Sequence, residues 1–387
     1  MSQNNIQDVL IIGGGPVGLL LGVLLRDQGV RVTVKEIRKD ISRTRCVKLL
    51  RRILSYDTVI DDIYLFSESQ LKERENAIGC IKPNLFETIA NWSERFIPLQ
   101  DIQERLLKEY VSLGGVIHYT NVYDTDTISN VLKTHSNTVV VDCTGYHSVL
   151  RDHISPKNRI DRFIEYVLIC TFIYEENYVC NALCKYYKNQ NTRKFRIIPA
   201  IGDTYSINQQ RETHVTCLIT IEEPLFQQLS QVGRITYDYL KQNQKQIYDD
   251  LNTFLNNLST ENLSKIRFDT MKFICIPLQV YRARNLTYTA SDNELNQHWV
   301  LMGDAAMGGP YFQSISIGFE SAIYFAYLFK QMNGDIQKML KKYEEYVDKL
   351  WLSLQIRTKE IQRDKQILQA MLCTNDPKEI LKKLKTY

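Results

Sequence analysis

The sequence contains no run of apolar residues long enough to cross a membrane as a helix, which takes about 20 residues. Its first residues lack the basic start and the apolar core of a secretory signal peptide, so we expect a cytoplasmic protein. Lys and Arg outnumber Asp and Glu by only 48 − 44 = 4, too small a surplus to indicate a nucleic-acid partner. In residues 330–387 basic residues do exceed acidic ones, which indicates a solvated helical face in preference to a membrane or partner surface.

Patterns that bind metals are missing as well. The nine cysteines are scattered without a Cys-x-x-Cys pair, and Cys180 and Cys184, which are spaced to share a helix face, have no pair of histidines near them. We therefore expect reduced, mostly buried thiols and no metal site. The six histidines are dispersed, and no Ser-His-Asp or paired-carboxylate arrangement is evident, so we name no catalytic residue.

The N-terminal region, in contrast, shows a strand, a helix and a second strand in succession. Residues 9–12 form an apolar run that ends in glycines, as a buried parallel strand does. The apolar residues that follow repeat with the period of a helix, and Gly29 stands where a helix commonly ends. Gly22 is expected to let this helix lie close to the sheet. A second strand, residues 30–34, then leads to Glu36.

The glycines after the first strand have the spacing Gly13-x-Gly15-x-x-Gly18. Gly13 allows a sharp turn, Gly15 leaves room for a diphosphate against the backbone, and Gly18 lets the helix pack on the strand. The N–H groups and the dipole at the start of the helix favour an anion there. Glu36 is placed to accept hydrogen bonds from a ribose diol. The pattern predicts a dinucleotide site, and the alternative is a glycine-rich turn in an unrelated α/β domain.

Several arginines follow this unit, namely Arg38, Arg43, Arg45, Arg51 and Arg52. A basic run is typical of a solvated face, and an arginine that reaches the diphosphate is an equal alternative. Residues 56–76 show no sustained period and predict no element.

Farther along, the chain changes from an alternation of helix and strand to consecutive strands. Residues 99–113 predict an amphipathic helix, followed by strands at 116–119 and 137–145. Long alternating strands between 163 and 221 predict an antiparallel sheet in a second domain. The remaining predictions are helical structure at 223–257, strands at 273–280 and 299–302, a helix at 316–329, and a long helix from 336 that Asp335 caps.

Three segments, taken in this order and spacing, resemble the FAD-dependent aromatic hydroxylases, the single-component flavoprotein monooxygenases that include p-hydroxybenzoate hydroxylase and kynurenine monooxygenase. They are the glycine turn with Glu36, VVVDCTGYHSVLR at 139–151, and WVLMGDAA at 299–306 followed by PYFQSISIGFESA at 310–322. The resemblance extends over nearly the whole chain. It implies an α/β protein with a Rossmann-type FAD-binding domain, an inserted substrate domain of antiparallel sheet, and C-terminal helices.

The resemblance also implies domain limits and a reaction. The FAD-binding domain would comprise residues 1–80, 96–160 and 273–330, the substrate domain residues 81–95 and 161–272, and a helical segment residues 331–387. Such an oxidoreductase uses FAD, NAD(P)H and O2 to hydroxylate a small aromatic or apolar substrate. The alternatives are an FAD-dependent dehydrogenase or reductase on the same fold, and a non-catalytic relative that acts as an interaction protein.

Carried over by motif, the cofactor-binding residues would be Gly13, Gly15, Pro16, Val17, Gly18, Glu36, Arg45, Gln100, Gly145, Gly303, Asp304, Ser316 and Gly318. Arg43 competes with Arg45 for its role. The start of the helix near Ser316 would face the pyrimidine edge of the flavin, where negative charge develops on reduction.

Two departures from the family pattern concern the middle and third segments. Thr144 stands where the family usually has an aspartate, and Met307 stands where it usually has a histidine; Ser148 and Arg151 are retained. The glycine-rich turn of the family is replaced by bulkier residues that follow Pro310. We expect the substrate pocket between the flavin edge, the sheet near residues 170–173 and 195–198, and a loop that contributes Met307, Pro310, Tyr311 and Phe312.

Overall fold

The computed structural model describes residues 8–373 except 42, 44, 57–62, 122–137, 155–158, 176–194, 196, 208–209, 259–264, 293–294, 311–312 and 333–334. Tyr311, Phe312, Cys180 and Cys184 therefore lie outside the described residues. Within the described part, no helix combines the length and the apolar character needed to traverse a bilayer.

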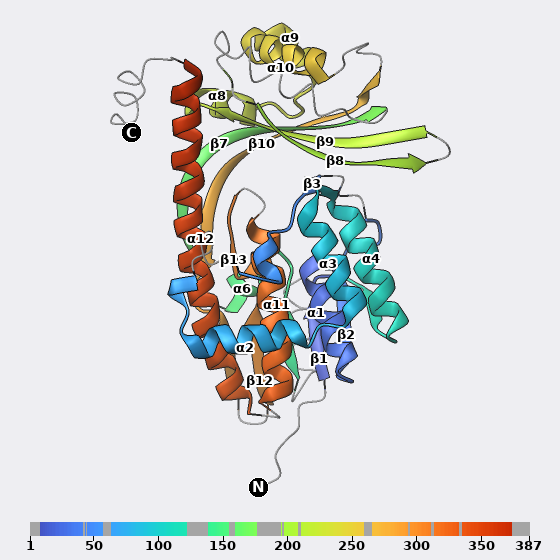
Figure 1. Cartoon of the computed structure of the whole chain (residues 1–387), viewed down its shortest axis with the longest axis vertical. Coiled ribbons are helices and arrows are strands. Elements are labelled where there is room, and N and C mark those ends of the chain that lie inside the picture. The colour runs from blue at the N-terminus through green and yellow to red at the C-terminus, as the bar shows by residue number, and fades with distance from the viewer. Residues whose placement is uncertain are drawn as a thin grey trace.

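A six-stranded sheet forms the centre of the first domain (Figure 1). Its strands, in spatial order, are β11 (Thr287–Asp292), β12 (Leu295–Leu301), β6 (Val139–Asp142), β1 (Asp8–Ile12), β2 (Arg31–Glu36) and β5 (Val116–Tyr119). All neighbours are parallel except β11 and β12. Val9 and Ile11 contribute to the main core on one face, whereas Leu10 and Ile12 belong to a smaller cluster on the other. The central strands β1 and β6 are buried on both faces, as the apolar run in the sequence predicted for β1.

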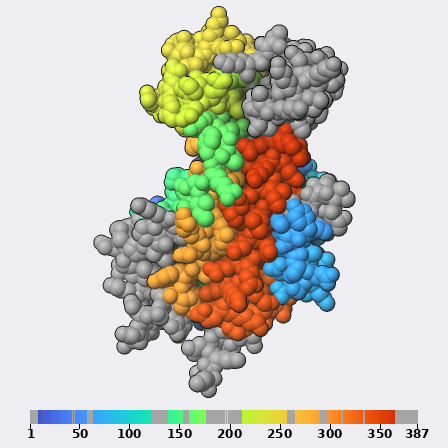
Figure 2. All heavy atoms as spheres, turned by 90° about the vertical axis from the view of Figure 1, so that its left-hand side faces the viewer, coloured from blue at the N-terminus to red at the C-terminus, as the bar shows by residue number. Residues whose placement is uncertain are grey.

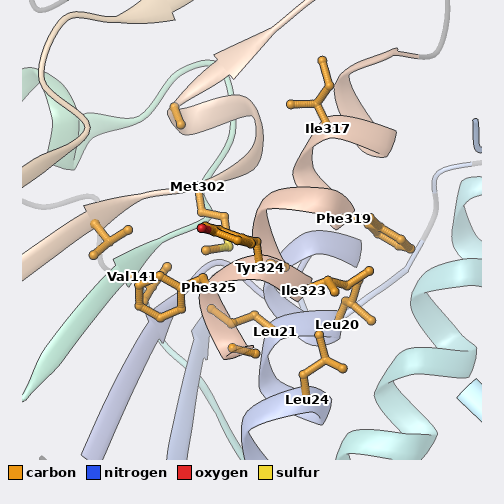
Figure 3. Packing of buried hydrophobic residues seen from close by; sticks show 14 of the residues in the cluster. Leu20, Leu21, Leu24, Val141, Met302, Ile317, Phe319, Ile323, Tyr324 and Phe325 are labelled. Atoms are coloured by element: carbon orange, nitrogen blue, oxygen red, sulfur yellow. The ribbon is translucent and has the colours of Figure 1, made fainter. Parts of the chain in front are cut away.

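Helices α1 (Pro16–Asp27), α4 (Leu99–Ser112) and α11 (Gln313–Gln331) share the main core of this domain. Figure 3 shows Leu20, Leu21 and Leu24 of α1 close to Ile323 and Phe325 of α11. Most residues of α11 are buried. The helix extends from position 313 to position 331 and is therefore longer than the predicted helix of 316–329.

Gly22 has a different task from the one that we predicted. A Cβ atom at Gly22 would lie 2.9 Å from the ring of Tyr110, so the missing side chain lets α1 approach α4 and not the sheet. The Tyr110 hydroxyl in turn donates to the carbonyl of Val32 at 2.8 Å. Gly22 thus fixes the packing of two helices that flank the glycine turn.

A five-stranded antiparallel sheet forms the second domain, in the order β13 (Met307–Gly308), β10 (Ile266–Ala283), β7 (Arg159–Glu175), β9 (Gln210–Ile221) and β8 (Ile197–Ile207). One face packs against α8 (Glu223–Ser230), α9 (Tyr237–Asn243) and α10 (Lys245–Leu258) (Figure 1). Cys170, Phe172, Phe195 and Ile197 point to these helices. Alternation in β7 therefore turns Ile169 and Thr171 toward the first domain, so those two, and not Cys170 or Phe195, face the expected pocket.

Two helices that the sequence did not predict cover the first domain. They are α2 (Glu68–Gly79), with weak apolar periodicity, and α3 (Pro83–Glu94). Leu85, Ile89 and Trp92 of α3 lie in the main core with α1 and α4. Residues 81–95 therefore pack with the first domain and not, as expected, with the substrate domain. A short ladder of β3 (Cys46–Val47) and β4 (Ile97–Pro98) lies beside the second sheet, where the Cys46 N–H donates to Thr216 Oγ1 at 3.2 Å.

The last described helix, α12 (Ile336–Cys373), runs along both domains (Figures 1 and 2). Its Tyr343 hydroxyl donates to the carbonyl of Leu301 in the first sheet at 2.9 Å. Farther along, Gln355 accepts a hydrogen bond from Arg162 and Gln362 donates to the carbonyl of Ile164, both in β7. Helix α12 therefore connects the two sheets.

A buried ionic cluster joins α2, α11 and α12. The Glu320 carboxylate accepts hydrogen bonds from Arg52 at 3.2 Å, Arg74 at 3.1 Å, Tyr56 at 2.7 Å and Tyr346 at 2.8 Å. Burial alone would raise the pKa of Glu320, but the two guanidinium groups lower it to about 2. The carboxylate thus balances the charge of two buried guanidinium groups.

We expect Glu320→Gln to lower the free energy of unfolding by about 3–5 kcal/mol at pH 7, because it removes the charge that both arginines share. The native pKa lies below the ordinary value of 4.5, so this stability is present above about pH 4.5 and is lost as the pH falls toward 2. Urea unfolding across that range should show the loss in the wild type and not in the variant. Glu360→Gln, on an exposed position of α12, is the control; equal stability of both variants at pH 7 would contradict the prediction.

Candidate functional site

The turn between β1 and α1 needs glycine at two positions for its own packing. Gly13 has φ +107°, and a Cβ atom there would lie 2.5 Å from the carbonyl oxygen of Cys143. A Cβ atom at Gly18 would overlap the carbonyl oxygen of Gly13 and contact Ile11 at 3.1 Å. These residues bring the start of α1 against β1 and the end of β6, as the spacing predicted.

Gly15 differs from both, because a Cβ atom there would meet no atom within 4 Å. Its φ of −73° and ψ of 178° are ordinary for any residue, so neither backbone strain nor packing requires glycine at this position. It is the N-cap of α1, and Pro16 occupies the first turn. Open space beside helix N–H groups is the arrangement that a diphosphate fits, and the observed turn passes this test for a dinucleotide.

Two side chains hold the peptide groups of Gly14, the residue before this open position. The Glu36 carboxylate accepts from the Gly14 N–H at 2.7 Å, and the Gln103 amide donates to the Gly14 carbonyl at 2.8 Å. Glu36 also accepts from the Arg38 N–H at 2.8 Å. The same oxygen, Oε1, also accepts from Arg38 Nε at 3.4 Å, whereas Oε2 keeps a second lone pair for a ribose hydroxyl. Glu36 can therefore orient the turn and bind a ribose together.

Gln103 is a functional candidate that the sequence analysis missed. It lies one turn after Gln100 in α4 and is 8% exposed. The only sequence signal is a polar residue among the apolar positions of the buried face of α4, and that signal does not reveal its partner.

Asp304, Arg45 and Arg43 come together from distant parts of the chain. The Arg43 carbonyl accepts from the Gln100 N–H at 3.0 Å and the Arg45 carbonyl from the Leu99 N–H at 2.9 Å, which places both arginines beside the start of α4. All three charged side chains are exposed to solvent. Even so, surrounding protein raises the pKa of Asp304 and lowers that of Arg45, with each charge opposing the shift of the other. Residues that are both accessible and enclosed are expected to line a recess.

Other predicted cofactor residues connect the elements around this recess. Gly303 has φ +60°, and Cβ atoms at Gly303 and Gly318 would lie 3.2 and 2.5 Å from the Val17 side chain. The Ser316 hydroxyl is buried and accepts from the Leu50 N–H at 2.9 Å. Their observed contacts therefore bring α1, α11 and the Asp304 turn together. Gly145 has φ +98° with open space around it.

The middle motif is organised by Asp142, which the sequence analysis did not single out. Its buried carboxylate accepts from the Thr144 N–H at 2.9 Å, from the Thr144 hydroxyl at 2.6 Å and from the Ser148 hydroxyl. Burial raises the pKa of Asp142, and the hydrogen bonds from Ser148 and Thr144 oppose the rise. Arg151 then donates to the carbonyl of Ala305 at 3.1 Å. An acid two residues before position 144 thus orders the turn where the family has its aspartate.

Of the predicted substrate residues, Met307 and Pro310 are described, and both are buried. Met307 is 1% exposed, lies in the main core and pairs with Arg282 of β10. Its side chain therefore packs in the core below the surface of the loop and is not available to line an open pocket. Among the described residues, no group of His, Cys, Asp or Glu side chains has the geometry of a metal site.

We expect Gly15→Val to abolish FAD retention while leaving the protein folded, since the new side chain would occupy space that no protein atom uses. The dissociation constant for FAD should rise by about a hundredfold or more, measured by flavin fluorescence. Gly79→Val, at another glycine with open surroundings, is the control and should keep FAD. Full flavin content in Gly15→Val would show that the diphosphate does not lie at this turn.

Gln103→Met keeps the length of the side chain but removes the donor to Gly14. The unpaired carbonyl should loosen the turn and weaken FAD binding by about tenfold. Titration of the apoprotein with FAD measures the effect, with Lys108→Met on the exposed side of α4 as the control. Identical FAD affinity in the two variants would remove Gln103 from the site.

Residues 7–52, which contain the glycine turn, Glu36 and Arg45, match the family model of the FAD binding domain. No sequence among curated proteins matches the chain. Three solved structures are similar over 98% of it. CtdE in complex with FAD has 12% identity, a TM-score of 0.54 and 98% of its own chain covered. The p-nitrophenol 4-monooxygenase PnpA from Pseudomonas putida DLL-E4 has 11% identity, a TM-score of 0.53 and 93% of its own chain covered. The tetracycline destructase Tet(51) has 12% identity, a TM-score of 0.52 and 96% of its own chain covered.

At these identities the structures establish the fold alone, and the family model adds the nature of its first segment. The chain therefore has the fold of these three structures, and its first segment, residues 7–52, is similar to the FAD binding domain, as the resemblance seen in the sequence implied.

Proposed function

We propose that the protein is an FAD-dependent monooxygenase that uses NAD(P)H and O2 to hydroxylate a small aromatic or apolar substrate. The observation that carries this proposal is the open position at Gly15. It is supported by the Glu36 carboxylate, which bonds to the neighbouring Gly14 N–H, and by Gly303, next to Asp304, which lies against Val17. The similarity to a structure named p-nitrophenol 4-monooxygenase and to one described in complex with FAD supports it.

Each protein group would hold a different part of FAD. The N–H groups at the start of α1 would bind the diphosphate, and Glu36 would bind the adenosine ribose. Asp304 would bind the ribityl chain, while Arg45 balances the negative charge nearby. When bound, FAD supplies the redox chemistry that connects NAD(P)H, O2 and the substrate.

The second sheet would provide the dry wall that such chemistry needs. Val167, Ile169 and Leu278 form an apolar cluster, and their strands turn this face toward the first domain. Thr216, which bonds to Cys46, lies on the same face of β9. A wall of branched apolar residues with few charges favours an apolar or aromatic substrate and excludes water from it.

Purified protein should show the visible spectrum of bound flavin and should oxidise NADPH faster in the presence of its substrate. A panel of phenols and other small aromatic compounds, tested with 18O2, should give a product that carries one labelled oxygen atom, detected by mass spectrometry. Substrate oxidised or reduced without label would indicate a dehydrogenase or reductase. Absence of flavin would indicate a non-catalytic relative, and Gly15→Val serves as the flavin-free control in every assay.

A further inference from the structure

We propose that Tyr281 is a positioning residue for the cofactor: from a strand of the substrate sheet, its hydroxyl fixes the turn that carries Asp304. The inference rests on the proposed function, because that function assigns Asp304 to FAD. It adds a physical link between the substrate domain and the cofactor site.

The end of β10 holds the whole segment that follows Asp304. The Tyr281 hydroxyl donates to the Asp304 carbonyl at 3.0 Å, and the Ala283 N–H donates to the Ala306 carbonyl at 2.7 Å. Tyr281 also pairs with Gly308 in the antiparallel ladder of β10 and β13. Three successive connections therefore fix residues 304–308 to one strand end.

Packing leaves Tyr281 no alternative position. Its side chain is 5% exposed. The rings of Tyr281 and Tyr146 pack edge to face, with their centroids 4.7 Å apart. A Cβ atom at Gly308 would lie 2.5 Å from the Tyr281 hydroxyl oxygen, so the glycine makes the space that the hydroxyl fills. Burial, and next the charge of Asp304, raise the pKa of Tyr281, which keeps the hydroxyl a donor at neutral pH.

Arg151, from the first domain, holds the next carbonyl of the same turn. Its guanidinium donates to the Ala305 carbonyl at 3.1 Å and to the Tyr146 carbonyl at 2.9 Å. Two consecutive carbonyls, of Asp304 and Ala305, thus accept from side chains of two different domains. The Asp304 side chain is left exposed on a turn whose backbone is fixed.

Strand β10 connects Tyr281, which bonds to the Asp304 turn, with the apolar face of the second sheet. The strand extends from Ile266 to Ala283 with a shift of register between Leu278 and Gln279, and Leu278, in the apolar cluster, is three residues before Tyr281. A substrate that rests against this face would lie on the strand that positions Asp304. The carboxylate, and with it the cofactor, is therefore placed relative to the substrate wall.

Tyr281→Phe removes the hydroxyl and keeps the ring, and Arg151→Lys removes the planar fork that reaches two carbonyls. In the full-length protein, FAD dissociation constants, the visible circular dichroism of bound FAD and apoprotein melting temperatures would be measured for both variants and for the double variant. Tyr288→Phe, on an exposed position of β11, is the matched control. We expect about a tenfold weaker affinity for FAD and an altered visible dichroism in each single variant.

Because both residues act on one turn, the double variant should lose less affinity than the product of the two single losses. A lower melting temperature with unchanged FAD affinity and dichroism would mean a merely structural role and would overturn the proposal. Multiplicative losses would show that the two residues do not share the turn and would overturn it too. Should Tyr281→Phe not fold, unchanged FAD binding in Arg151→Lys would contradict the proposal that hydrogen bonds to the carbonyls of residues 304 and 305 position the cofactor. Lack of FAD in the wild type, in contrast, would refute the proposed function itself.

Discussion

The parallel pairing of β1 with β2 and β6 is the constraint on which the site depends. Ile12 pairs with Lys35 on one side and with Asp142 on the other, and Asp142 pairs with Leu301 of β12. Parallel strands end at the same edge of a sheet, so the glycine turn, Glu36, the middle motif and Asp304 all emerge there. A slip of one residue in any of these ladders would turn its acid away from the recess.

The two sheets keep their relation through elements that belong to both. β10 belongs to the second sheet and ends at the loop that follows Asp304, whereas α12 bonds to β12 at Tyr343 and to β7 at Gln362. The charge cluster around Glu320 anchors α12 and α11 below the site. A site between two domains needs such anchors, because the geometry of the groups that line it depends on parts that do not touch the ligand.

Local patterns in the sequence were sufficient for the glycine turn, the strand that ends at Glu36, the antiparallel sheet and the long final helix. The contacts that the sequence did not reveal join positions far apart in the chain: Gln103 bonds 89 positions back to Gly14, and Arg151, which the motif retains, bonds 154 positions ahead to Ala305. Gly22 was assigned to the wrong neighbour because the spacing in one helix does not say which second helix it meets. Helix α2 has a nearly uniform polar surface, so periodicity did not reveal it.

The departures at Thr144 and Met307 have one physical explanation in the structure. Neither position presents a charged or titratable group. Hydrogen bonds to Asp142 hold the turn that contains Thr144, and pairing with β10 holds the segment that contains Met307. In this chain a buried carboxylate supports the first turn, and hydrogen bonds to backbone carbonyls support the second. Among the described residues, Glu36, Arg45, Asp304 and the backbone of the glycine turn are polar groups at this edge of the sheet. Under the proposed function, the apolar face of the second sheet would select the substrate.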